Sequence, residues 1–303
     1  MSRNFYTNIE LNLLSLISNG IGNDSIKGKA VIRGYKLLSK STGKYTVHYD
    51  NKRTHNSFDI TISAPYDNLY AELLILGTIE KGTVNFLKSF VKNGDMVFDV
   101  GANIGFYSLL FSTSGPDTKI YSFEPMPVTF ERLKQNVFLN SKQNNININN
   151  IALSDKDEDL KIYLFKELHH GYSSISTQGR SDAVGFDVHG TTLDKFVSEN
   201  KINSVDLIKI DVEGAEKKVL QGAKESIMKF HPSVLMEMNF ETCEASGYKC
   251  SELMDMLSGS NDYILYKFPS ARGNLTKMKD KADFSHGDNV LFVSPKHKDR
   301  IKS

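Results

Sequence analysis

The fold of this chain is decided by the stretch Gly94-Asp-Met-Val-Phe-Asp-Val-Gly-Ala-Asn-Ile-Gly-Phe-Tyr-Ser108. Its apolar run, Asp95 to Val100, predicts a short buried strand. Gly101 to Gly105 predicts a tight turn, and the residues from Phe106 onward predict the start of a helix. A strand, a glycine turn and a helix in this order are typical of an α/β fold with a parallel sheet.

The sequence on either side of this stretch repeats the same alternation. Further strands are predicted at Lys119–Phe123, Asn145–Ala152, Val205–Ile210 and Ser233–Glu237, with helical segments after most of them. We therefore expect a doubly wound, mostly parallel sheet. Two late apolar segments, 263–268 and 289–293, have no long helical segment between them, so they predict an antiparallel edge at the C-terminal end of the sheet.

Residues 1–75 differ in character from the rest of the chain. Short segments at Lys29–Ile32, Tyr45–Tyr49 and Phe58–Ile62 alternate apolar and polar residues after one short apolar helix, which predicts an antiparallel hairpin or small sheet. We divide the chain into this N-terminal arm, residues 1–75, and a core domain, residues 76–303.

Composition narrows the class of protein. With 37 Lys and Arg against 36 Asp and Glu, the chain has no basic field that would by itself indicate a nucleic-acid partner. Cys243 and Cys250 lack a CxxC spacing and a histidine pattern, which argues against a zinc site or a disulfide framework. The apolar stretch Ile9–Ile17 lacks the features of a signal peptide, and no run reaches the length of a membrane span. We therefore expect a reduced, cytoplasmic protein.

The turn after the first core strand indicates a nucleotide-type cofactor. Ligands of a doubly wound sheet bind beyond the carboxyl ends of the strands, where Asp99, Gly101 and Glu124 stand. The turn is not the GxGxxG of dinucleotide binding, because Asn103 occupies the place of the middle glycine. A looser turn with acidic and amide groups suits a methionine sulfonium cofactor, which has no pyrophosphate, and Glu124 is placed to accept both ribose hydroxyls. The alternative is an ordinary glycine turn between a strand and a helix.

Several motifs in order resemble the FkbM family of methyltransferases. The resemblance starts with the stretch quoted above and continues through Ser122-Phe-Glu-Pro125, Asn150-Ile-Ala-Leu-Ser-Asp155 and Thr192-Leu-Asp194 to Leu207-Ile-Lys-Ile-Asp-Val-Glu-Gly-Ala-Glu216, Val219-Leu-Gln-Gly-Ala223 and Asn289-Val-Leu-Phe-Val293. It implies a Rossmann-like class I methyltransferase that uses S-adenosylmethionine, commonly on hydroxyls of sugars, glycolipids or related metabolites. It also implies cofactor-binding residues: Asp99, Gly101, Asn103, Gly105 and Glu124 at the methionine and ribose, and Ala152 and Leu153 beside the adenine.

Three carboxylates at strand ends are candidates for catalysis. Asp211 and Glu213 follow one strand and Glu237 ends the next, so all three should lie where the methyl group emerges. They could bind the acceptor hydroxyl or a divalent metal, and oxygen ligands would favour magnesium or calcium over zinc. The alternative for Asp211 and Glu213 is helix capping. If the carboxylates are structural, His170 or His189 becomes the candidate base.

The function that these features favour is S-adenosylmethionine-dependent O-methylation of a small-molecule or glycan hydroxyl. Two alternatives remain at this stage: a nicotinamide-dependent oxidoreductase on the same fold class, and a non-catalytic binding module that retains the cofactor pocket. The sequence predicts neither the acceptor nor the oligomeric state.

Overall fold

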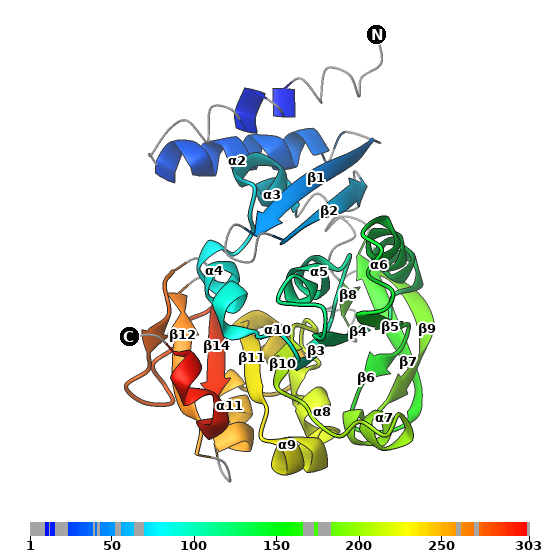
Figure 1. The fold of residues 1–303 in the computed structure, drawn as a ribbon, viewed down its shortest axis with the longest axis vertical. Helices are drawn as coiled ribbons and strands as arrows, with labels where there is room; N and C mark the ends of the chain where they lie inside the picture. Colours follow the sequence, from blue (N-terminus) through cyan, green and yellow to red (C-terminus); the bar gives the residue numbers. More distant parts are fainter. Residues whose placement is uncertain are drawn as a thin grey trace.

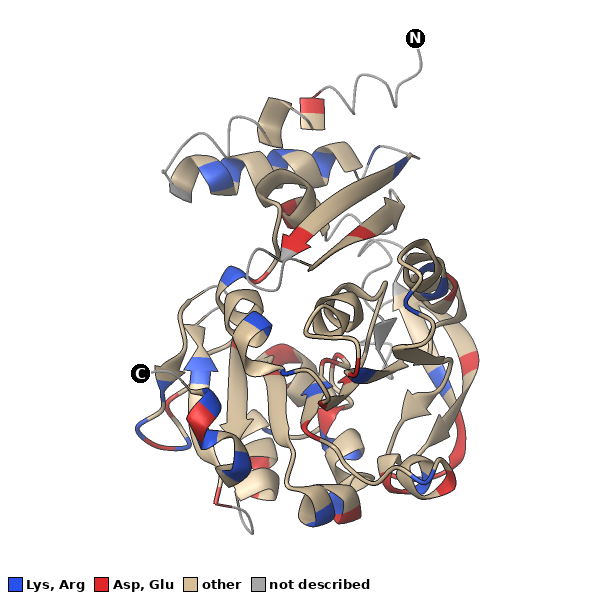
Figure 2. Cartoon of the chain, in the orientation of Figure 1, with Lys and Arg blue, Asp and Glu red and all other residues tan. Residues whose placement is uncertain are grey.

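The computed structural model (Figure 1) describes residues 10–11, 13–15, 24–38, 40, 43–51, 56–63, 70–165, 173–174, 183–258, 262–269 and 273–301. No helix among these residues is both long enough and apolar enough to cross a membrane. Acidic and basic residues alternate along the chain of the core (Figure 2), as expected from the nearly balanced charge.

The core of the described structure is an eight-stranded sheet with the order β13-β12-β14-β11-β10-β3-β4-β5. Five neighbouring strands are parallel: β3 (Met96–Val100), β4 (Lys119–Phe123), β5 (Ile146–Asn149), β10 (Leu207–Ile210) and β11 (Ser233–Met238). The remaining three pair antiparallel at one edge: β14 (Asp288–Val293), β12 (Ile264–Phe268) and β13 (Thr276–Lys277). Both the parallel sheet and the antiparallel C-terminal edge confirm the predictions.

Helices cover both faces of this sheet. They are α4 (Lys81–Phe90), α5 (Phe106–Ser112), α6 (Pro127–Leu139), α7 (Leu193–Glu199), α8 (Glu216–Gln221), α9 (Lys224–Phe230), α10 (Phe240–Ala245), α11 (Cys250–Ser258) and the 3₁₀ helix η3 (Pro295–Arg300). Successive strand residues point to opposite faces, so Val97 packs in one apolar cluster and Phe98 in another. A sheet buried on both faces explains why its strands read as continuous apolar runs.

A second, four-stranded sheet lies beside the parallel one in the described part of the chain. Its order is β6 (Ala152–Leu153), β9 (Ala183–Thr191), β7 (Glu158–Phe165) and β8 (Ser173–Ser174). The prediction of one strand over Asn145–Ala152 is wrong, because β5 ends at Asn149 and the chain then enters this other sheet. The Asn150 side chain fixes the change of direction by donating hydrogen bonds to the carbonyl oxygens of Glu124 and Pro125 at 2.8 and 2.9 Å.

The N-terminal arm contains α2 (Asp24–Leu38), the antiparallel hairpin β1 (Lys44–Asn51) and β2 (Asn56–Ser63), and α3 (Ala71–Leu76). The hairpin confirms the prediction for its two segments. The predicted strand at Lys29–Ile32 is wrong, because these residues belong to α2. Ala30, Gly34 and Leu38 are its buried positions, a spacing of four that only a helix presents on one face, and a run of four alternating residues was too short to reveal it.

The arm is joined tightly to the core. Asn136 of α6 and Asn140, which directly follows that helix, each accept a hydrogen bond from the β2 backbone, at the N–H groups of Thr61 and Asp59, over 2.8 and 2.7 Å. Phe58 also packs edge to face on Phe106 of α5, with 5.7 Å between the ring centroids. The division at residue 75 stays a prediction, and residue 75 itself lies inside α3.

Candidate functional site

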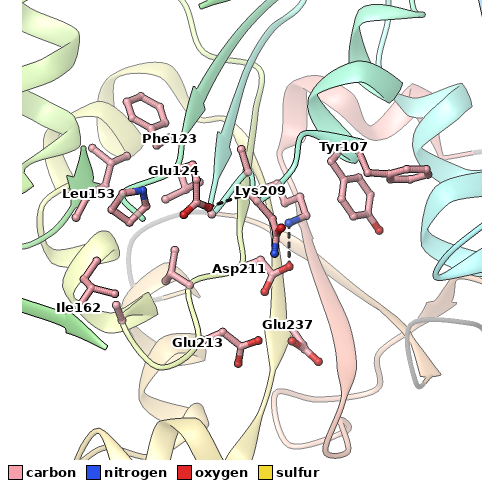
Figure 3. Close-up of a pocket in the computed structure, with 18 of the residues that line it drawn as sticks. Tyr107, Phe123, Glu124, Leu153, Ile162, Lys209, Asp211, Glu213 and Glu237 are labelled. Carbon is pink, nitrogen blue, oxygen red and sulfur yellow. Dashed lines mark hydrogen bonds and ion pairs between the residues drawn. The ribbon is translucent and has the colours of Figure 1, made fainter. Parts of the chain in front are cut away.

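One pocket opens at the carboxyl ends of the parallel strands, where the sequence predicted it. Its volume is about 320 Å³. Figure 3 shows apolar side chains, including Leu153 and Ile162, at one end, and the acidic side chains of Asp211, Glu213 and Glu237 away from them. We refer to these as the apolar end and the acidic end.

The glycine turn after β3 forms the floor between these ends. Gly101 has a φ of +80°, and a Cβ there would lie 1.8 Å from the carbonyl oxygen of Asp211, so the turns after β3 and β10 touch backbone to backbone. Gly105 precedes α5 with a φ of +93°, and a Cβ there would lie 2.6 Å from Leu133 Cδ1. Gly101 and Asn103 line the pocket, whereas Gly105 lies outside its lining and brings α5 close to α6.

Glu124 lies at the middle of the pocket with both carboxylate oxygens already oriented. Oε2 accepts a hydrogen bond from the Asn103 N–H at 2.9 Å, and Oε1 accepts one from the Met126 N–H at 3.0 Å. Burial raises the pKa of Glu124 to about 7 against the opposing effect of these two bonds. Each oxygen retains a lone pair for a further donor, so the group fits a ligand with two adjacent hydroxyls, such as a ribose.

The apolar end is built by three elements. Phe123 of β4, Ala152 and Leu153 of β6, and Leu160 and Ile162 of β7 line it. Such a wall fits a flat, weakly polar ring like adenine. The family resemblance placed Ala152 and Leu153 here, whereas Leu160 and Ile162 were missed because they belong to none of the motifs that carry the resemblance.

Asp99 lies beneath the pocket and does not line it. Its side chain is fully buried, with Oδ2 accepting a hydrogen bond from Ser108 Oγ at 2.6 Å, and burial raises its pKa. Lys209 lies opposite Asp99 in the paired strand, and its Nζ is 3.9 Å from Asp99 Oδ1. Asp99 thus lies below the pocket floor, and its predicted role at the cofactor stays a prediction.

Lys209 is the main residue that sequence reasoning missed. Its Nζ donates to Asp211 Oδ2 at 3.0 Å and lies 4.7 Å from the centroid of the Tyr107 ring. Burial alone lowers the pKa of Lys209, but the charges of Asp211 and Asp99 outweigh burial and hold that pKa above its ordinary value. The signal was present in the sequence, since a lysine in the middle of a buried apolar strand is rare unless it is paired.

Asp211, Glu213 and Glu237 come together at the acidic end, as predicted. Each contributes an oxygen to a group in which these atoms lie within 4.8 Å of one another. Burial, followed by the charge of Asp211, raises the pKa of Glu237 to about 8 and that of Glu213 well above its usual range. The acidic end therefore combines one carboxylate held by a lysine with two that retain protons easily.

The loop that carries two of these carboxylates is fixed by a further acid. Glu216 accepts hydrogen bonds from the Gly214 N–H at 3.2 and 3.1 Å, and Tyr248 Oη donates to Glu216 Oε2 at 2.7 Å. The helix-capping alternative thus applies to Glu216, which bonds the backbone at the start of α8, more directly than to Asp211.

Of the two histidine candidates, the structure describes only His189. His189 projects from β9 with its side chain 52% exposed, and its ring nitrogens lie 3.7 and 3.5 Å from Asp157 and Asp159. It is absent from the residues that line the pocket. His170 lies outside the described residues.

Comparison with known proteins agrees with the geometry. Residues 99–265, more than half of the chain, match the methyltransferase FkbM domain. Similar proteins include methyltransferase sdnD of Sordaria araneosa, 29% identical over 50% of this chain and 68% of that protein. The hexuronic acid methyltransferase AglP of Haloferax volcanii is 26% identical over 49% of this chain and 58% of that protein. The 31-O-demethyl-FK506 methyltransferase FkbM of Streptomyces tacrolimicus is 25% identical over 45% of this chain and 62% of that protein. The matched region thus spans about three fifths of the length of the last two proteins.

A solved structure, methyltransferase FkbM from Methylobacillus flagellatus, is also similar. It has a TM-score of 0.45 and 13% identity over 86% of this chain and 58% of that chain.

The match to the methyltransferase FkbM domain, on a parallel sheet with an antiparallel edge and a pocket at the strand ends, identifies an S-adenosylmethionine-dependent methyltransferase. The chain belongs to the FkbM methyltransferase family. This assignment favours a methyltransferase over the nicotinamide-dependent oxidoreductase considered above.

Proposed function

We propose that this protein transfers a methyl group from S-adenosylmethionine to a hydroxyl oxygen of a sugar, glycolipid or related metabolite. The observation that carries the proposal is the acidic end, where Glu237 combines a pKa of about 8 with a position beside Asp211 and Glu213. The names of two relatives, a hexuronic acid methyltransferase and a 31-O-demethyl-FK506 methyltransferase, support a hydroxylated acceptor.

The residues present fit the cofactor. Glu124 would hold the ribose hydroxyls, Ala152, Leu153 and Ile162 would enclose the adenine, and the turn of Gly101 and Asn103 would face the methionine part. When bound, S-adenosylmethionine supplies a methyl group on a sulfonium, which an oxygen nucleophile can accept.

Glu237 has the chemistry of the base that this transfer needs. An alkyl hydroxyl is too weak an acid to ionise near neutral pH, so its proton must pass to a positioned group. A base acts best when its pKa lies close to the working pH, which favours Glu237. Asp211, held by Lys209, would orient the hydroxyl, and Glu213, whose pKa is raised well above its usual range, would keep its proton beside it.

A magnesium ion is a second version of the same proposal. Three carboxylate oxygens within 4.8 Å of one another suit the oxygen preference of a hard divalent cation. Such an ion would polarise the acceptor oxygen in place of direct proton removal.

We also propose that the N-terminal arm shapes the acceptor side. Tyr70 and Glu72 from the end of the arm line the pocket, as do the residues that follow it, Ile79 and Glu80. A cytoplasmic location and the absence of nucleic-acid binding stay predictions. The free thiols of Cys243 and Cys250 fit a reducing compartment.

The test is methyl transfer from labelled S-adenosylmethionine to the glycan, glycolipid and small-molecule extract of the source cell. We expect labelled products that mass spectrometry identifies as methyl ethers, about 10²-fold slower formation with Glu237→Gln, and a loss of transfer with Tyr70→Ala at unchanged binding of S-adenosylhomocysteine. Label found only on nitrogen or carbon, or none despite bound S-adenosylhomocysteine, would overturn the proposal.

A further inference from the structure

Glu80 occupies a strained position at the entrance to α4. Its φ is +40°, in the left-handed region that residues other than glycine rarely adopt. Such strain persists only where the surroundings hold the residue in place, and it is found frequently at functional sites. Glu80 lines the pocket, and no motif of the sequence analysis includes it.

One oxygen of the Glu80 carboxylate is held from two sides. Tyr107 Oη donates to Glu80 Oε2 at 2.6 Å, and Asn289 Nδ2 donates to the same oxygen at 2.9 Å. Asn289 is fixed in turn, because its Nδ2 also lies 3.1 Å from Thr83 Oγ1 in α4. Contacts from α5 and β14 therefore set the direction of the carboxylate.

The other oxygen has no such contact. Within the described part of the chain, the hydrogen bonds to the Glu80 side chain all go to Oε2, and Oε1 receives none. A carboxylate oxygen accepts strong hydrogen bonds, so a fixed and partly buried group with one unused oxygen is suited to a ligand that donates.

Glu80 also lies within electrostatic reach of the proposed base. Burial and then the charge of Asp211 raise the pKa of Glu80, and Glu80 in turn contributes to the raised pKa of Glu237. Glu80 and Glu237 both line the pocket, so a molecule whose reacting hydroxyl meets Glu237 occupies the same space that Glu80 lines.

We propose that Glu80 Oε1 accepts a hydrogen bond from a second hydroxyl of the acceptor, next to the one that is methylated. The substrate class is then a polyol with adjacent hydroxyls, such as a sugar ring, and isolated alcohols are poor substrates. This inference rests on the proposed methyl transfer to a hydroxyl.

The variant that tests it is Glu80→Gln. Asn289 requires an acceptor at the Oε2 position, so the glutamine carbonyl takes that place and its amide donates where Oε1 accepted. We expect a rise in the KM for the acceptor of about ten- to hundredfold, the usual effect of losing a hydrogen bond to a charged group. Binding of S-adenosylhomocysteine should not change. Tyr107→Phe, which keeps Glu80 but removes one contact that orients it, should raise the KM less.

Periodate supplies an independent test, because it cleaves the bond between carbons that carry adjacent hydroxyls. The source-cell extract is treated with periodate, the excess periodate is quenched, and only then are the enzyme and labelled S-adenosylmethionine added, because the ribose of the cofactor itself carries adjacent hydroxyls. For the KM measurement, Glu225→Gln on the exposed surface of α9 is the matched control variant. We expect wild-type labelling to disappear after periodate. Transfer that continues after periodate, or an unchanged KM in a folded Glu80→Gln variant, overturns this inference while methyl transfer itself stands. Absence of transfer by the wild type overturns the proposed function and this inference together.

Discussion

The apolar and acidic ends of the pocket solve different physical problems. At the apolar end, side chains of β6 and β7 shape the pocket and exclude water from it. The free energy of binding there comes from the apolar area that a ligand buries. At the acidic end, Asp211 pairs with the buried Lys209, while burial and repulsion shift the pKa of Glu213 and Glu237, and of Glu80 in the same pocket, upward. A substitution at the apolar end should therefore leave the neighbouring residues largely unaffected, whereas a substitution at the acidic end shifts the pKa of the neighbouring carboxyls.

The largest effect that this contrast predicts is that of Lys209→Met. The lysine side chain is 7% exposed and lies between Asp211 and the fully buried Asp99. Removing one partner of a buried ion pair leaves an uncompensated charge and costs about 3 to 5 kcal/mol. We expect that loss in the free energy of unfolding measured with urea.

The matched control is Lys195→Met, because Lys195 pairs with Asp157 on the exposed surface of α7. That variant should unfold at nearly the wild-type urea concentration. Equal loss of stability in both variants would show that the buried ion pair of Lys209 contributes no more to stability than the exposed pair of Lys195.

A smaller effect is expected from Asp211→Asn, which preserves shape and removes one charge. Turnover should fall by roughly 10² or more, with S-adenosylhomocysteine affinity nearly unchanged, as measured by steady-state kinetics and calorimetry. Loss of activity with a chelator and recovery with magnesium would support the metal version over direct base catalysis. If Asp211→Asn and Glu237→Gln both turn over at the wild-type rate, these carboxylates are structural.

Glu124→Ala tests the middle of the pocket, between its two ends. The variant should weaken S-adenosylhomocysteine binding by about 1.5 to 3 kcal/mol, because it removes the carboxylate that would accept the ribose hydroxyls. Isothermal calorimetry measures the change, and thermal unfolding checks that the variant is folded. Wild-type affinity would refute the ribose contact.

The smallest predicted effect is a change with pH in the affinity of the cofactor site for a ligand that contains a ribose. The pKa of Glu124 is about 7, raised by burial, and the ionised form is the better acceptor for hydroxyl donors. Affinity should therefore rise with pH, by about tenfold between pH 6 and pH 8 if only the ionised form binds. 5′-Methylthioadenosine is the suitable probe, since it has the ribose but no amino acid group. Glu124→Gln should bind it with a flat profile, and a flat profile in the wild type would contradict the prediction.

Much of the fold could be predicted from the sequence because its signals are local. The apolar run of β3, the glycine turn and the strand ends at Glu124, Asp211 and Glu237 follow from composition along a few residues. The topology rule that places ligands at the carboxyl ends of parallel strands then brings these distant positions together. Where the local signal was short, as at Lys29–Ile32, prediction failed because four residues cannot distinguish a strand from one turn of a helix.

The sequence by itself determined the family, the parallel core and the carboxylates at the strand ends. Only the tertiary structure decided that Asp99 lies below the floor rather than lining the pocket, that Lys209 pairs with Asp211, and that Glu80 comes from outside every motif to face the same space. The physical reason is that burial and the distances between charges depend on which elements pack together. The sequence shows that a residue carries a carboxylate, but the pKa of that carboxylate, its hydrogen-bond partners and any oxygen left without one are set only when the chain is folded.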